Sequence, residues 1–274
     1  MTEALSSRTS ARRLGEIMEL AREAGRVSVE DLAARFAVTP QTIRRDLNEL
    51  CDSRALTRVH GGAIIASGVE NLAYEARKLV LQPHKRLIGE AAAQQVADHS
   101  SLFINLGTTT EEVARALHGH VGLLVITNNL QVAVELFADK DIEVILAGGA
   151  VRRADGGMVG AATVEHIRQF RTDLAIIGIS AVDPDGTLLD FDVREVEVSQ
   201  AIIRNARRVL LVTDGSKFSR AAPVRIAHLS DVDLLVTDRL PSPTVAALCM
   251  MHGVEVLEVG GPTEPDDAGA RAMA

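Results

Sequence analysis

The sequence has few of the residues that mark a disulfide-stapled or exported protein. It contains two cysteines among 274 residues, Cys51 and Cys249, and they match no metal-ligand spacing. Residues 1–13 mix acidic, serine and arginine residues and have no apolar segment of the kind found in secretory signals. We therefore expect a reduced, cytoplasmic protein.

Long hydrophobic runs are also absent. The longest strongly apolar stretch, Leu174–Val182, is interrupted by Gly178 and Ser180 and falls far short of the roughly 20 residues that a membrane span needs. Apolar residues nevertheless make up 47% of the chain and charged residues 24%, a composition that excludes disorder and provides a core. The sequence therefore predicts a globular protein that does not bind a membrane.

Lysine is scarce, and charge is divided unevenly along the chain. Only four of the 29 basic residues are lysines, and the net charge is −8. Residues 1–62 hold ten arginines and nine acidic residues, a balance of +1, whereas the rest of the chain carries −9. This division indicates a small recognition module joined to an acidic partner domain.

The N-terminal segment carries three helical patterns followed by a short strand. Apolar residues recur at helical spacing over 14–21 and 29–36, and a third helix is expected from Pro40 to about Cys51. Residues 56–60 are typical of a strand, with Gly61–Gly62 as its turn. Two helices joined by a tight turn and followed by a strand and a glycine turn describe a winged helix-turn-helix.

The third helix is expected to have a buried stripe of Ile43, Leu47 and Leu50 and an exposed face that includes two arginines. An arginine fork matches the O6 and N7 atoms of guanine, so this face can read a major groove. The alternative is a plain packing module in which the arginines are solvated and Arg45 pairs with Glu49.

Two stretches, Val38–Leu47 and Arg58–Ala63, resemble the signature of the DeoR family of bacterial transcriptional repressors. The resemblance implies operator DNA as a partner and a homo-oligomer that binds two half-sites. Two wing residues are expected to reach the DNA backbone or minor groove. The candidate DNA contacts are Thr39, Gln41, Thr42, Arg44, Arg45, Arg58 and His60.

The rest of the chain alternates apolar strands with helices. This order predicts a largely parallel sheet covered on both faces, an α/β fold. We expect a DNA-binding domain over 8–63, a linker over 64–82 with a short helix near Tyr74, an effector domain over 83–260 and a disordered tail over 261–274.

Glycines and hydroxyl residues follow several of the predicted strands. Gly107–Thr110 ends one strand and opens a helix, an arrangement that can bind a phosphate or can simply cap the helix. Loops at the carboxyl ends of parallel strands are where such sheets bind ligands. The candidate effector-binding residues are Lys85, Gly107, Thr108, Thr109, Thr110, Thr127, Asn128, Asn129, Gly148, Gly149, Gly178, Ser180, Asp190, Glu195 and Lys217.

Two of these candidates are acids that leave an enzymatic alternative open. Asp190 and Glu195 straddle a strand–helix transition, where they can bind hydroxyls or act as bases in a sugar-phosphate isomerase. His118 and His120 have no acidic or cysteine partner at ligand spacing, so we expect no metal and no cofactor.

The second half of the chain also resembles the sensor domain of the DeoR family, which is similar in fold to ribose-5-phosphate isomerase and coenzyme A transferases. The likeness rests on segments such as Leu146–Gly149, Gln169–Arg171, Asp190–Asp192 and Ser216–Phe218. It implies a non-enzymatic repressor of a glycerol or carbon catabolism operon with sn-glycerol 3-phosphate as inducer. A different phosphosugar is the alternative inducer.

Overall fold

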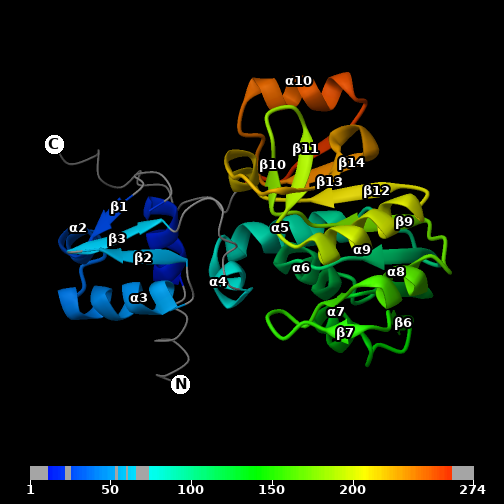
Figure 1. Ribbon diagram of the computed structural model, residues 1–274, viewed down its shortest axis with the longest axis horizontal. Coiled ribbons are helices and arrows are strands. Elements are labelled where there is room, and N and C mark those ends of the chain that lie inside the picture. The colour runs from blue at the N-terminus through cyan, green and yellow to red at the C-terminus, as the bar shows by residue number, and fades with distance from the viewer. Residues whose placement is uncertain (1–11, 22–25, 53–54, 60, 66–73, 261–274) are drawn as a thin grey trace, which may run out of the picture.

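A computed structural model describes residues 12–21, 26–52, 55–59, 61–65 and 74–260, which form two domains (Figure 1). Residues 8–11 and the tail over 261–274, included in the expected domain boundaries, lie outside these ranges. Among the described helices none has the length and apolar character that crossing a bilayer requires.

The N-terminal domain combines three helices with a three-stranded antiparallel sheet of order β1-β3-β2. Its elements are a helix over 12–21, β1 (Arg26–Ser28), α2 (Val29–Arg35), α3 (Pro40–Asp52), β2 (Leu56–Val59) and β3 (Gly62–Ile65). Ser28 caps α2, its hydroxyl accepting from the Asp31 amide at 3.0 Å. The predicted winged helix-turn-helix is confirmed, with β2 and β3 as the wing.

A single core fixes α3 within this domain. Ile43 and Leu47 of α3 are fully buried against Ile17 of the first helix and its neighbours. Asp46, on the same side of α3, accepts two hydrogen bonds from Arg13, at 2.6 and 3.0 Å. Removing these apolar side chains from water, together with the buried ion pair, holds α3 in one orientation.

The C-terminal domain is built on a seven-stranded parallel sheet of order β15-β14-β12-β9-β4-β5-β6. The strands are β4 (Ser101–Ile104), β5 (Leu123–Thr127), β6 (Ile142–Leu146), β9 (Leu174–Ile177), β12 (Val209–Val212), β14 (Leu234–Thr237) and β15 (Glu255–Glu258). The predicted α/β fold with a parallel sheet is confirmed.

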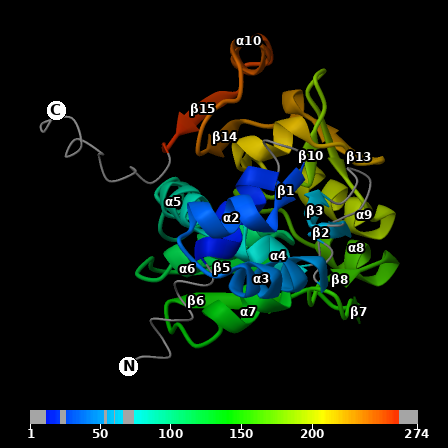
Figure 2. The same cartoon turned by 90° about the vertical axis from the view of Figure 1, so that its left-hand side faces the viewer.

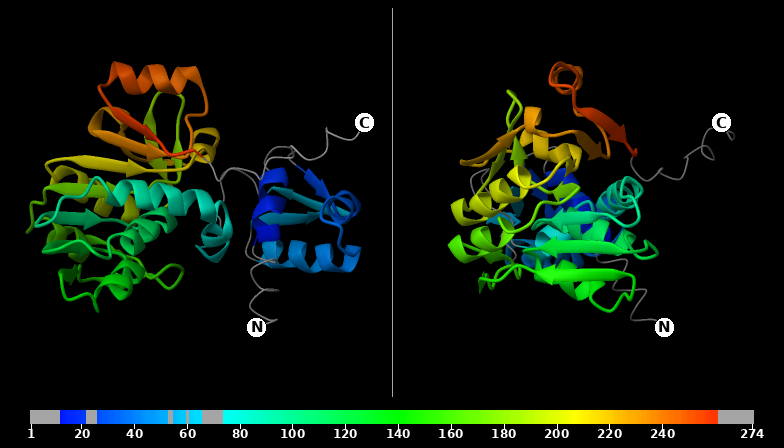
Figure 3. Two further views of the ribbon diagram at one scale, coloured as in Figure 1. Left: turned by 180° about the vertical axis from the view of Figure 1, so that it is seen from behind. Right: turned by 90° about the vertical axis from the view of Figure 1, so that its right-hand side faces the viewer.

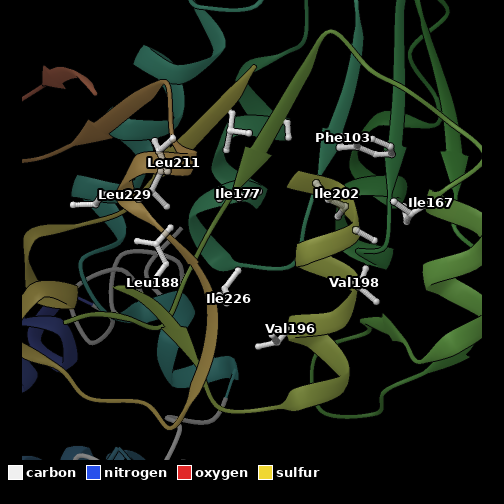
Figure 4. Packing of buried hydrophobic residues seen from close by; sticks show 14 of the residues in the cluster. Phe103, Ile167, Ile177, Leu188, Val196, Val198, Ile202, Leu211, Ile226 and Leu229 are labelled. Carbon is white, nitrogen blue, oxygen red and sulfur yellow. The ribbon is translucent and has the colours of Figure 1, made fainter. Parts of the chain in front are cut away.

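Helices cover both faces of this sheet (Figure 3). One layer contains α5 (Gln82–Ala93), α6 (Thr108–Ala116) and α7 (Leu130–Leu136), and the other contains α8 (Ala161–Ile167), α9 (Val193–Arg204) and α10 (Pro243–Met251). Side chains alternate between the layers: Leu102 and Ile104 face α5 and α6, while Phe103 faces α9 (Figure 4). This alternation is the two-residue period of a strand buried on both sides.

The structure also contains several smaller elements. They are α4 (Tyr74–Leu79) at the expected short helix, the hairpin β7 (Ala150–Val151) and β8 (Met158–Val159), the sheet of β10 (Ala181–Val182), β11 (Thr187–Asp190) and β13 (Val224–His228), and the turns η1 (Gly215–Ser219) and η2 (Leu229–Asp231). Only α4 was expected among these; β7, β8 and β10 have two residues each, too few to show a readable alternation.

Candidate functional sites

The exposed face of α3 carries the polar residues that the sequence placed there. Thr39 precedes α3, and its hydroxyl accepts from the Thr42 amide at 3.2 Å. Gln41, Arg44 and Arg45 are exposed, and Thr42 is half-buried. The N-terminal half of α3 therefore presents an amide and two guanidinium groups to solvent.

The acidic residues of α3 do not neutralise this face. Asp46 is 2% exposed and bonds to Arg13 on the opposite side of the helix. Within the described residues, Arg44 and Arg45 form no ion pair, and the Arg45–Glu49 pair considered from the sequence is not formed. Both guanidinium forks are available for bases or phosphates.

The wing contributes one visible cation. Arg58 is exposed on β2, which pairs with β3. His60, the other wing residue expected to contact DNA, lies outside the described residues. Figure 2 views the molecule from the side on which the DNA-binding domain lies, and α3 forms the lower edge of that domain in this view.

A pocket opens where the strand order of the large sheet reverses. The chain proceeds from β4 to β5 and β6 on one side, and β9 then pairs with β4 on the other. Open α/β sheets bind ligands at the carboxyl ends of the strands that flank such a reversal. The pocket holds about 390 Å³ of empty space, part of it open to solvent, and is lined by Arg77, Leu106, Gly107, Thr108, Thr109, Gly178, Ile179, Ser180, Asp190, Glu195, Val212, Thr213 and Lys217.

One part of the lining favours negative charge. Gly107 ends the loop after β4 with φ of +154°, and α6 begins at Thr108. The first amides of a helix have no intrahelical partner, and together with the helix dipole they attract an anion. Arg77 adds a guanidinium group and Lys217 an amine to the same lining.

The surroundings of Lys217 disfavour its charged ammonium form. Burial lowers the pKa of Lys217 well below its usual value, and Arg220 lowers it further, while Asp214 raises it. Asp214 also shapes the η1 turn that carries Lys217, since its carboxylate accepts from the Ser216 amide at 3.0 Å. A bound anion would favour the charged form of this lysine.

Two buried acids occupy another part of the lining. Asp190 accepts from the Ser180 hydroxyl at 2.9 Å and from the Phe191 amide at 2.7 Å. Glu195, in the first turn of α9, accepts from the Arg152 guanidinium at 2.5 Å. Burial raises the pKa of Glu195 to about 7, and the neighbouring Asp190 adds to this rise. Such carboxylates can accept hydrogen bonds from ligand hydroxyls.

Arg152 ties the acids to the β7–β8 hairpin. Its guanidinium donates to Asp155 at 2.5 and 2.9 Å, to Asp192 at 2.9 Å and to Glu195. Asp192 is the N-cap of α9, and its hydrogen bonds to Arg194 and Arg152 hold its pKa well below the usual range. This network fixes the start of α9, and with it Glu195.

Eight of the fifteen candidate effector residues line the pocket, namely Gly107, Thr108, Thr109, Gly178, Ser180, Asp190, Glu195 and Lys217. The other seven do not line this pocket. The Lys85 ammonium donates to the Arg77 carbonyl, and the Thr110 hydroxyl donates to the Gly107 carbonyl at 2.8 Å.

The remaining five follow β5 and β6, on the far side of β4 from the reversal. The Thr127 hydroxyl donates to Ile104, the Asn128 amide donates to Met158, and Asn129 caps α7. Gly148 and Gly149 are exposed beyond the edge strand β6.

The sequence did not indicate two polar residues that line the pocket, Arg77 and Thr213. Both carry buried polar atoms, the Arg77 Nε and the Thr213 Oγ1, that have no hydrogen-bond partner among the described residues. A buried donor without a partner costs free energy, which an acceptor on a ligand would recover. Thr213 lies at the carboxyl end of β12, and that position was a usable signal.

No cluster of three or more potential metal-ligating side chains occurs in the part of the chain that the structure describes. His118, one of the two closely spaced histidines, lies with its Nδ1 3.0 Å from Asp139. His120 pairs in the same way with Asp98, also at 3.0 Å.

Comparison with known families covers both domains. Residues 13–69 match the DeoR-like helix-turn-helix domain, and residues 82–239 match the DeoR C terminal sensor domain. The glycerol-3-phosphate regulon repressor of Escherichia coli is 45% identical over 240 residues, covering 88% of this chain and 95% of that protein. Its Haemophilus influenzae namesake is 46% identical over 230 residues, covering 84% of this chain and 90% of that protein.

More distant likenesses extend to other proteins. The repressor CsqR of Escherichia coli is 36% identical over 253 residues, covering 92% of this chain and 97% of that protein. Among solved structures, ribose 5-phosphate isomerase A from Neisseria gonorrhoeae aligns with a TM-score of 0.36 and 16% identity, over 49% of this chain and 52% of that one. A 4-hydroxybutyrate CoA-transferase from Porphyromonas gingivalis aligns with a TM-score of 0.39 and 15% identity, over 63% of this chain and 52% of that one.

Proposed function

Because this chain belongs to the DeoR family of transcriptional repressors, we propose that it represses a glycerol-catabolism operon and is induced by sn-glycerol 3-phosphate. Its helix-turn-helix domain binds operator DNA, and its sensor domain binds a small effector. Because the family consists of repressors, the isomerase alternative is excluded. Asp190 and Glu195 are therefore ligand-binding acids rather than catalytic bases.

The observation that carries the proposed inducer is the chemistry of the pocket lining. Amides at the start of α6, Arg77 and Lys217 suit a phosphate, while Ser180, Asp190 and Glu195 suit hydroxyl groups. A phosphorylated polyol carries both kinds of group, and glycerol without phosphate lacks the one that the cations select. Two similar proteins are glycerol-3-phosphate regulon repressors, which supports the choice of glycerol 3-phosphate among such ligands.

The DNA-binding step follows from the geometry of α3. Gln41, Arg44 and Arg45 enter the major groove, Thr39 and Thr42 lie at the phosphate next to the helix N-terminus, and Arg58 meets the backbone. One short helix reads too few base pairs for useful specificity, so two copies bind two half-sites as a homo-oligomer. The inducer binds the low-affinity conformation better, and a coupling of about 1–3 kcal/mol, or about 5–150-fold, is enough for induction.

Calorimetric titration of the full chain tests the inducer. We expect sn-glycerol 3-phosphate to bind and glycerol to give no heat, because glycerol lacks the phosphate that the cations contact. Fructose 1-phosphate is the comparison for a different phosphosugar. Stronger binding of fructose 1-phosphate would keep the repressor and replace its inducer, whereas equal binding of glycerol would show that the cations do not select a phosphate.

A further inference from the structure

The segment that joins the two domains packs against both of them. α4 lies at their junction (Figure 1), and the residue that follows it, Val80, is 4% exposed within the core of the DNA-binding domain. Leu81 packs against the same core, and α5 of the sensor domain begins directly afterwards at Gln82. A displacement of α4 therefore acts on residues that belong to the packing of the DNA-binding domain.

α4 is also fixed to the end of α6 that supplies the pocket's amides. The Tyr74 hydroxyl donates to the Glu111 carboxylate at 2.8 Å. The Arg77 carbonyl accepts from the Lys85 ammonium, and the Thr108 hydroxyl lies 3.5 Å from the same carbonyl oxygen. Since Thr108 and Glu111 both belong to the first turn of α6, a change at this turn reaches α4 directly.

The Arg77 side chain is placed in the pocket but is held loosely there. Its Nε is buried without a hydrogen-bond partner among the described residues. Its ion pair with Asp155 is long, at 3.7 Å, and that carboxylate is bound more closely by Arg152, at 2.5 Å. An anion that entered the pocket would give this guanidinium the strong, charge-assisted contact that the protein alone does not supply.

The joint between α4 and α5 has an uncommon backbone conformation. Leu81 has φ of +53° and ψ of +30°, a left-handed conformation that residues with a branched side chain rarely adopt. Conformational changes between domains are absorbed by a few residues at the ends of elements. Leu81 stands at such a position, between Val80 in one core and the first turn of α5 in the other domain.

We propose that Arg77 transmits the occupancy of the pocket to the DNA-binding domain. A bound phosphate engages the Arg77 guanidinium, α4 shifts with it, and Val80 carries the shift into the core that orients α3. This inference rests on the proposed function, because it requires an anionic inducer in this pocket. It assigns to one linker residue two roles, contact with the inducer and coupling to DNA release.

Three full-length variants test the proposal. Arg77→Ala removes the contact, Arg77→Lys keeps the charge and the stem but not the planar fork, and Arg86→Ala removes an exposed arginine of the next helix, which pairs with Glu90, as the matched control. Each is titrated with sn-glycerol 3-phosphate in a calorimeter, and each is titrated again while bound to labelled operator DNA. Thermal melting confirms that each is folded.

Arg77→Ala is expected to bind sn-glycerol 3-phosphate about tenfold or more weakly, and its operator affinity without inducer is measured first as the reference for release. At concentrations that saturate this variant, it should still keep its DNA. Arg77→Lys should release DNA only partly at saturation, and Arg86→Ala should behave as the unaltered chain does.

Full release of DNA by saturated Arg77→Ala or Arg77→Lys would overturn the coupling role of Arg77. Release by these variants at the inducer concentration that suffices for the unaltered chain would also overturn the contact between Arg77 and the inducer. These outcomes leave the proposed function intact. If the unaltered chain itself neither binds sn-glycerol 3-phosphate nor releases DNA, the proposed inducer fails, and the role of Arg77 fails with it.

Discussion

Placing a negative charge at Thr109 should separate DNA binding from induction. Thr109 is 7% exposed, lines the pocket and is the second residue of α6. An aspartate at this position is compatible with the helix, because a carboxylate in the first turn is stabilised by about 0.3–1 kcal/mol through the helix dipole. Thr109→Asp is therefore expected to fold and to bind operator DNA normally.

The effect on the inducer is much larger. Two unit charges about 4 Å apart repel by about 4 kcal/mol at an effective dielectric constant of about 20. That energy corresponds to a loss of about 1,000-fold in affinity for a phosphorylated ligand. Because the pocket is partly open to solvent and salt screens the repulsion, we expect at least about a 100-fold loss.

The assay compares Thr109→Asp with Thr109→Asn, which has nearly the same shape and no charge. Fluorescence anisotropy of labelled operator DNA is followed as sn-glycerol 3-phosphate is added. The asparagine variant should release DNA within about tenfold of the unaltered inducer concentration, since it loses one neutral hydrogen bond at most. Release by Thr109→Asp at unaltered concentrations would place the phosphate elsewhere, and weak DNA binding without inducer would show that the carboxylate itself acts as the anion.

Three further variants test other parts of the account. Arg44→Ala should weaken specific operator binding by about 1–3 kcal/mol without lowering the melting temperature, because Arg44 is exposed and has no ion pair among the described residues; equal affinities would place the recognition face elsewhere. Asp46→Asn should destabilise the DNA-binding domain by about 2 kcal/mol, since it leaves Arg13 partly buried without a counter-charge; an unchanged denaturation midpoint would contradict this. The pKa of Glu195, raised to about 7 from 4.5, means that the folded chain binds more protons than the unfolded chain between these values, so its stability falls as pH rises through that window. Glu195→Gln should remove up to about 3 kcal/mol of this loss of unfolding free energy with rising pH. The same dependence of unfolding free energy on pH in both proteins would refute this.

Local patterns in the sequence were enough to predict helix α3 with its exposed polar face and the glycine–threonine turn that opens α6. The spacing of Ile43 and Leu47 fixes which side of α3 is buried, and the exposed side then carries Arg44 and Arg45. Gly107 and Thr108 follow a strand and open a helix, which is where the structure places the start of α6. These features depend on neighbouring residues alone, so the sequence contains them.

The composition of the pocket depends instead on strand order, which the sequence did not reveal. Asn128 and Asn129 follow β5, a strand on the far side of β4 from the pocket, so they bond to local backbone groups and to Glu111. Arg77 was missed for a related reason. Its position depends on the contact of Tyr74 with Glu111, 37 residues away, and residues 64–82 have no regular apolar period.

The measurement that tests the central claim most directly is release of DNA by the inducer from the unaltered, full-length protein. A labelled duplex that the protein has selected from a random pool is bound to saturation, and sn-glycerol 3-phosphate, glycerol or inorganic phosphate is added while anisotropy is recorded. We predict that sn-glycerol 3-phosphate releases the duplex, that glycerol does not, and that inorganic phosphate acts only at far higher concentration. A duplex that stays bound at concentrations of sn-glycerol 3-phosphate that saturate the pocket in calorimetry would contradict the account.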